Sequence, residues 1–115
     1  DANGNELWSR TFGGAAKDAA RSVDQTSDGG YVLAGLTRSF GAGQADAYLV
    51  KTDALGNETW STTLGGPGED SAVSVAQTPD GGYVLACATA SSGGGTDRAW
   101  VVKTDPFGNP GPPLP

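Results

Sequence analysis

The feature that most constrains the fold of this chain is a tandem repeat with a period of 52 residues. Residues 1–52 align with residues 53–104 without a gap, and 31 of the 52 aligned pairs are identical. The run Asp28–Ala34 returns unchanged as Asp80–Ala86, and Val50–Asp53 returns as Val102–Asp105. Periods of this length are typical of architectures in which each copy is one supersecondary unit that packs against its neighbours. The fold therefore has to build the same unit twice.

The repeat divides the 115 residues into three parts. Residues 1–52 are the first repeat, residues 53–104 the second, and residues 105–115 an aborted third repeat with a proline-rich tail. Because proline cannot donate to a strand ladder, we expect the tail 110–115 to pair with nothing and to be an extended linker or a truncated end. The chain begins at Asp1 and contains no Met, so we expect a processed chain, an excised fragment or a partial sequence.

Each period contains four short strand-like runs separated by glycine-rich turns. Residues 6–12 alternate, with Trp8, Arg10 and Phe12 on one face. The runs 21–26, 31–37 and 47–52 follow, and 31–37 is so apolar that we expect it to be covered on both faces. The turns 28–30 and 53–57 carry the Asp, Asn and Gly residues typical of tight hairpins. Together with the 19 glycines, which disfavour long helices, this pattern predicts an all-β fold.

Four antiparallel strands in about 50 residues, repeated head to tail, are typical of a β-propeller. Here the pattern is Trp-x-x-Thr-x-Gly-Gly-x-x-x-Asp-x-x-x-Ser-Val-x-Gln-Thr-x-Asp-Gly-Gly-Tyr, followed by Lys-Thr-Asp-x-x-Gly-Asn. Over residues 1–109 it resembles the propeller repeats of secreted and cell-surface proteins of archaea and bacteria. The stretch 53–60 is also similar to the blade-docking motif of quinoprotein-like propellers. That resemblance implies that Trp8, Trp60 and Trp100 pack between blades, whereas the residues of quinoprotein catalysis have no counterpart here.

The strand order implied for this chain leaves one blade incomplete. If the strands of a blade are named a to d from Arg21, Tyr31, Ala47 and Thr59, the chain reads d, a-b-c-d, a-b-c, two blades in which the last lacks its outer strand. Two blades cannot close a ring, since propellers carry 4 to 8. We expect either that strand 7–12 of one chain pairs with the edge 99–104 of another, which gives rings or filaments, or that the missing blades belong to a longer parent protein.

Composition excludes several classes of function. The chain has no His and one Cys, so it cannot assemble a Ser-His-Asp or Cys-His triad or a tetrahedral zinc site, and we expect no catalytic residues, no cofactor and no metal. A net charge of −6 with scattered Lys and Arg makes nucleic acid a poor partner. No apolar run approaches the roughly 20 residues of a membrane span, and no leader precedes the first strand, so we expect a soluble chain.

The two copies differ most in the loops at one end of the predicted blades, 13–20 and 38–46 in the first copy. Since binding residues often lie on loops of a rigid scaffold, this end is a candidate interaction face for a carbohydrate or protein ligand. The alternative is that these loops differ because nothing constrains them. The candidate residues are Lys17, Arg38, Phe40, Gln44, Asp46, Glu69, Asp97 and Arg98.

Other polar residues favour structural roles. Residues 1–5 resemble the start of a calcium loop, but the spacing fits a hairpin turn better. Asp18 and Asp70 recur at the same place in each copy and are predicted to cap loops, and Cys87 is predicted to be a small buried residue. Asn57 lies in a sequon, a candidate N-glycosylation site if the chain is exported.

The sequence therefore leaves three functions open. The first is a noncatalytic structural or adhesive propeller module of an extracellular or cell-surface protein that assembles by strand exchange. The second is a lectin-like or other ligand-binding propeller module, and the third is a fragment of a larger propeller enzyme. The first is favoured, because the residues of the loop face differ between copies where repeated binding sites should match.

Overall fold

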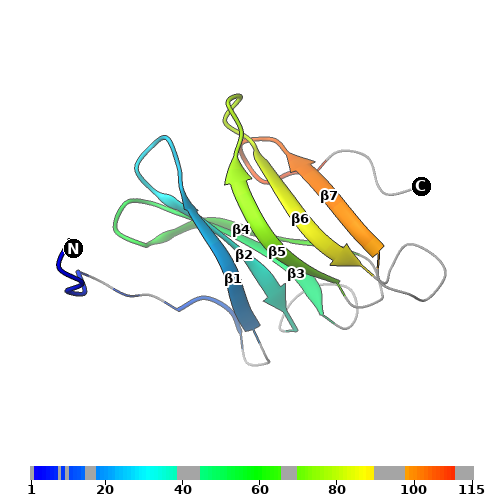
Figure 1. Ribbon diagram of the computed structural model, residues 1–115, viewed down its shortest axis with the longest axis horizontal. Helices are drawn as coiled ribbons and strands as arrows, with labels where there is room; N and C mark the ends of the chain where they lie inside the picture. The colour runs from blue at the N-terminus through cyan, green and yellow to red at the C-terminus, as the bar shows by residue number, and fades with distance from the viewer. Residues whose placement is uncertain are drawn as a thin grey trace.

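The computed structural model contains seven antiparallel strands in two sheets, and it describes residues 2–7, 9, 11–14, 18–38, 45–65, 70–89 and 98–110, with Arg98 described by its backbone alone. The first sheet has the order β1-β2-β3-β4 and the second β5-β6-β7 (Figure 1). The strands are β1 (Asp18–Gln25), β2 (Tyr31–Thr37), β3 (Asp46–Thr52), β4 (Glu58–Leu64), β5 (Asp70–Gln77), β6 (Tyr83–Thr89) and β7 (Arg98–Thr104). The all-β prediction is confirmed, and neither sheet closes on itself.

The two sheets share one register, as their repeated sequence requires. Tyr31 lies opposite Thr52 and Leu33 opposite Val50 in the first sheet, and the second sheet repeats both pairs 52 residues later. Both sheets also have an irregularity at the same place in their first strand, between Ala20 and Ser22 and between Ala72 and Ser74. The repeat therefore determines the bulges as well as the pairing.

The hydrophobic core lies between the sheets. The back face of the first sheet, which carries Val32, Ala34, Ala47 and Leu49, packs on the front face of the second sheet. That front face carries Val75, Tyr83, Leu85, Cys87 and Val102. Buried apolar surface of this kind is the main source of stability in a small domain. Figure 1 shows β5 beside the first sheet, and β7 at the far side of the second.

Polar groups on β1 hold the exposed edge of β5. The side-chain oxygen of Ser22 accepts the Val75 N–H at 3.3 Å, and a carboxylate oxygen of Asp24 accepts the Gln77 N–H at 3.2 Å. At the end of the strand, Gln77 Oε1 accepts the Ser27 N–H at 2.7 Å. The contact between the sheets thus combines an apolar centre with three hydrogen bonds to backbone N–H groups.

Three expectations from the sequence are corrected. The run 6–12 forms no strand at residues 6, 7, 9, 11 and 12, because in a single chain it has no neighbouring edge to pair with. Strand 31–37 is not fully covered on both faces: Val32 and Ala34 are buried, but Tyr31 and Leu33 are half-buried, because among the described residues no second sheet packs on the front of the first sheet. Pro110 does pair, through an isolated antiparallel bridge to Thr104, since a proline still offers its carbonyl as an acceptor.

Candidate interaction surfaces

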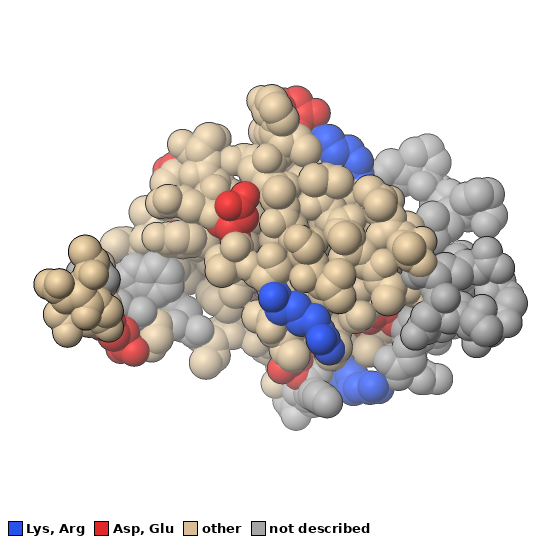
Figure 2. Space-filling model, viewed as in Figure 1, with Lys and Arg blue, Asp and Glu red and all other residues tan. Residues whose placement is uncertain are grey.

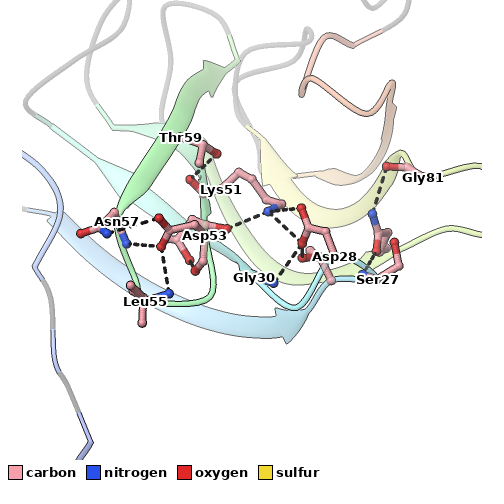
Figure 3. Close-up of polar contacts among 12 residues, drawn as sticks. Ser27, Asp28, Gly30, Lys51, Asp53, Leu55, Asn57, Thr59 and Gly81 are labelled. Carbon is pink, nitrogen blue, oxygen red and sulfur yellow. Dashed lines mark hydrogen bonds and ion pairs between the residues drawn. The ribbon is translucent and has the colours of Figure 1, made fainter.

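The tight turns at one end of the sheets are held by a repeated aspartate. In the first sheet, Asp28 Oδ1 accepts the Gly30 N–H at 2.9 Å and the Thr26 hydroxyl, and Lys51 Nζ lies 3.1 Å from Asp28 Oδ2 (Figure 3). These contacts lower the pKa of Asp28 to about 2, with the Thr26 hydroxyl the largest cause. The second sheet repeats the arrangement with Asp80, Gly82 and Lys103. The Asp and Lys residues that match between the two copies therefore stabilise the tight turns.

The turn after each third strand is built in the same way. Asp53 Oδ1 accepts the N–H groups of Leu55 and Asn57, each at 2.9 Å, and the Gly56 N–H donates to the Asp53 carbonyl at 3.1 Å (Figure 3). Asp105 makes the same contacts with Phe107 and Asn109, which lower its pKa. The hairpin prediction is confirmed for 53–57, and these acids do not converge as calcium ligands would. In the described ranges no three Asp, Glu or Cys side chains gather closely enough to hold a metal ion.

The loop-capping prediction for Asp18 is confirmed at the opposite end of the sheets. Asp18 Oδ2 accepts the Gly14 N–H at 3.1 Å, and Asp18 Oδ1 accepts the hydroxyl of Thr37. Asp70 accepts the Thr89 hydroxyl in the same way, and its own N–H donates to the Ala45 carbonyl at 2.7 Å. Both carboxylates hold the start of the first strand against the end of the second in each sheet.

The structure describes only part of the loop face expected from the sequence. Arg38 is exposed at the end of β2, as a surface residue should be, and the backbone of Arg98 begins β7. Asp46 is buried at 2% exposure in the first position of β3, so it differs from its expected place on an exposed face. Five further candidates lie outside the described residues: Lys17, Phe40, Gln44, Glu69 and Asp97.

Of the three expected blade-docking tryptophans, Trp60 contacts the other sheet and Trp100 packs against the core. Trp60 of β4 contacts Tyr83 of β6 edge-on, with ring centroids 5.8 Å apart, and both Trp60 and Trp100 pack against the core. Trp8 lies outside the described residues. The candidate glycosylation residue Asn57 is exposed in its turn, where its side-chain nitrogen donates to Asp53 Oδ2 at 3.2 Å.

The outer edge of β7 is the largest difference between the two sheets. In the first sheet β4 lies along β3, whereas β7, the counterpart of β3, has among the described residues only the bridge at Thr104 on that side. Lys51, which lies opposite Trp60, has a side chain 7% exposed, and its counterpart Lys103 is 47% exposed. Sequence reasoning predicted this open edge.

A second surface, which sequence reasoning missed, lies on the front face of the first sheet. A hollow of about 650 Å³ opens there, lined by Phe12, Val23, Tyr31 and Leu33 among others. The counterparts of the last three, Val75, Tyr83 and Leu85, are core residues of the second sheet. Their identity in the two copies was visible in the sequence, but the sequence did not show which copy would be covered.

The rest of the visible surface offers no concentrated charge. Figure 2 shows Asp, Glu, Lys and Arg scattered over one face of the molecule, with no large patch of a single sign. The part of the chain that the structure describes contains no helix of the length and apolarity that a bilayer span requires. Comparison with models of protein families and with curated proteins found no match for this chain.

Proposed function

We propose that this chain is a noncatalytic propeller module with a structural or adhesive role in an extracellular or cell-surface protein, and that it assembles with itself by strand exchange. The two sheets are its blades, and residues 7–12 of one chain supply the outer strand of the second sheet of the next chain. Rings of three or four chains would hold six or eight blades, and failure to close would give a filament.

The open edge of β7 is the observation that carries this proposal. Residues 6–12 share Glu, Trp, Ser and Thr at matching positions with 58–64, the residues of β4. They therefore have the sequence of the strand that β7 lacks. An exposed strand edge presents unpaired N–H and C=O groups and is a ready template for another strand.

The pairing in the first sheet specifies the register of the donated strand. Because Ala47 lies opposite Leu64 and Leu49 opposite Thr62, the proposal pairs Ala99 with Phe12 and Val101 with Arg10. Lys103 would then lie opposite Trp8, as Lys51 lies opposite Trp60, and the exposed stem of Lys103 would be covered. The turn 105–109 and the bridge at Pro110 already follow the first sheet, where Thr52 lies opposite Glu58.

The position of the two ends favours pairing between chains. In Figure 1 the N-terminal segment lies beside the first sheet, on the side away from the second, whereas β7 lies on the far side of the second sheet. In this conformation the described residues of 7–12 therefore do not lie along the edge of β7 of the same chain.

Light scattering coupled to size-exclusion chromatography tests the proposal on the full chain. We expect an oligomer, and we expect Ser9→Pro to convert it to monomers because proline removes a ladder N–H in the middle of the donated strand. Ser9→Thr, which suits a strand, is the matched control and should remain assembled. A folded wild-type monomer at all concentrations would overturn the proposal.

A disulfide between chains tests the register. In a Cys87→Ala background, the pair Arg10→Cys and Val101→Cys should oxidise to covalent oligomers, because directly opposite residues have neighbouring Cβ atoms. The control pair Thr11→Cys and Val101→Cys should not, since adjacent residues of a strand point to opposite faces. Equal crosslinking of the two pairs would contradict this register.

A further inference from the structure

We infer that a second copy of this chain docks by the back face of its second sheet into the hollow on the front face of the first sheet. The back face consists of Val84, Ala86, Ala99 and Val101. The inference rests on the proposed self-assembly. It goes beyond the exchange of one strand because it names the two sheet faces that meet when two chains assemble.

The contact between the two sheets of one chain is the template for this docking. There, the back face of the first sheet covers the front face of the second. The repeat places an equivalent back face on the second sheet and an equivalent front face on the first. Each chain therefore carries both halves of a contact that it already makes once.

At several positions on these two faces, residues are far more exposed than their counterparts in the contact within the chain. On the back faces, Leu49 of the first sheet is 0% exposed, and its counterpart Val101 is 72% exposed. On the front faces, Val75 of the second sheet is 5% exposed, and its counterpart Val23 is 62% exposed. Ala86 and Ala99 are likewise exposed, whereas their counterparts Ala34 and Ala47 are buried. Such apolar surface is typical of an interface.

The hollow already holds one element of the expected contact. Leu64, the last residue of β4, packs in the core beside the front face of the second sheet. Its counterpart Phe12 lines the hollow on the front face of the first sheet, with Tyr31 and Leu33. Phe12 thus lies at the position that corresponds to Leu64 in the contact within the chain, and a second copy would fill the space beside it.

Polar contacts make the junction between chains weaker than the one within a chain. Ser74 of the second copy keeps the hydroxyl of Ser22, so it can accept the Val23 N–H of the first copy as Ser22 accepts that of Val75. Ala76 is the counterpart of Asp24, which accepts the Gln77 N–H, but it has no carboxylate. Pro79 is the counterpart of Ser27, whose N–H donates to Gln77 Oε1, but it has no N–H. One of the three hydrogen bonds can therefore form between chains, and the rest of the binding free energy comes from the apolar contact.

The docking is head to tail, because the two surfaces differ. A front face cannot pair with a second front face through this geometry. Each chain therefore contacts one neighbour through its front face and another through its back face, and chains are added until the assembly closes. This gives a test in which each surface is blocked separately.

Sedimentation velocity on the full chain, across a concentration series, supplies that test. Val101→Asp blocks the back face and Val23→Asp the front face, because each places a charge in a contact that would be desolvated. We expect each change to weaken self-association by at least roughly 100-fold. An equimolar mixture of the two variants should form a dimer that cannot extend, since one intact surface of each kind remains. Phe107→Asp and Leu55→Asp, at equally exposed sites in the tight turns, are the matched controls and should assemble as the wild type does.

The outcomes separate this inference from the proposed strand exchange. If the wild type assembles and both face variants still assemble, the docking is overturned and strand exchange stands. If Ser9→Pro still assembles while the face variants do not, the docking stands without strand exchange. A monomeric wild type overturns both, and a dimer of Val101→Asp alone overturns the head-to-tail geometry.

Discussion

The indole of Trp60 and the phenol ring of Tyr83 meet edge to face across the two sheets, with their planes at 63° and their centroids 5.8 Å apart. Trp60 comes from the last strand of the first sheet and Tyr83 from the middle strand of the second. Because this aromatic contact joins strands of different sheets, it reports on how firmly the sheets hold together.

Replacing Trp60 tests the contribution of this contact to stability. We expect Trp60→Ala to lower the free energy of unfolding by about 2–3 kcal/mol, less than a fully buried Trp because Trp60 is half-buried. Trp60→Phe should lose about half as much, since a ring remains to meet Tyr83. Urea unfolding at one fixed protein concentration measures both, and a loss below about 0.5 kcal/mol for the alanine variant would contradict the prediction.

Gly108 lies against Trp60, so a substitution at Gly108 also tests how firmly the Trp60 ring is held. Its φ of +82° disfavours any side chain, and a Cβ there would overlap the six-membered ring of Trp60. Gly29 has a similar φ of +87° with open space around it. We therefore expect Gly29→Ala to cost about 1 kcal/mol from backbone strain alone, and Gly108→Ala about 1–2 kcal/mol more because Trp60 must shift. Thermal unfolding of both variants gives the comparison, and equal losses would show that the ring moves without cost.

Ala76 permits a gain of affinity if the second copy docks as inferred. Ala76→Asp restores the carboxylate that Asp24 uses to accept the Gln77 N–H within the chain, here for the Gln25 N–H of the next copy. We expect self-association to tighten by about 3- to 10-fold, the range of one typical hydrogen bond. Ala76→Lys cannot accept a hydrogen bond and should give no gain. Dilution experiments measure both, and no gain from the aspartate would contradict the proposed alignment of the two chains.

The lowered pKa of Asp28 leads us to expect that the chain loses stability in acid. Its pKa is lowered from 3.8 to about 2 in the folded chain, so its ionised form stabilises the fold at pH values above about 4. This contribution is lost as the pH falls from about 4 to 2, and it is roughly 1 kcal/mol because the carboxylate is largely exposed. We expect Asp28→Asn to be less stable than the wild type at pH 7 and equally stable near pH 2. A difference that is constant across this range, measured by urea unfolding, would argue against ionisation as the cause.

Cys87 serves as a probe of separation of the sheets. Its thiol is buried between them, and burial raises its pKa to about 11. Because the thiolate is the reactive form, we expect labelling by a thiol reagent at pH 8 to be slow in the native chain and fast in urea. Trp60→Ala should speed native labelling by weakening the contact between the sheets. Rapid labelling of the folded wild type would show that the sheets open readily.

Much of this fold was predictable from the sequence because its determinants are local. The Asp-Gly-Gly turn at 28–30 forms a tight hairpin since Asp28 and two glycines satisfy the turn by themselves, and the strand order within each sheet follows from such hairpins. The loop-capping role of Asp18 and the burial of Cys87 were also predicted. Asp46 was misplaced because sequence assigned it to a loop, whereas it begins β3 and is buried.

By itself, the sequence determined that the same sheet is built twice, with matching turns, register and bulges, because these depend on contacts between neighbouring residues. It could not determine burial, since Val23 and Val75 are the same residue in the same repeat position. Only the tertiary structure decided that Val75 is covered and Val23 is not, because burial depends on which sheet lies against each face. The repeat supplies two front faces and two back faces, and packing within one chain covers one of each.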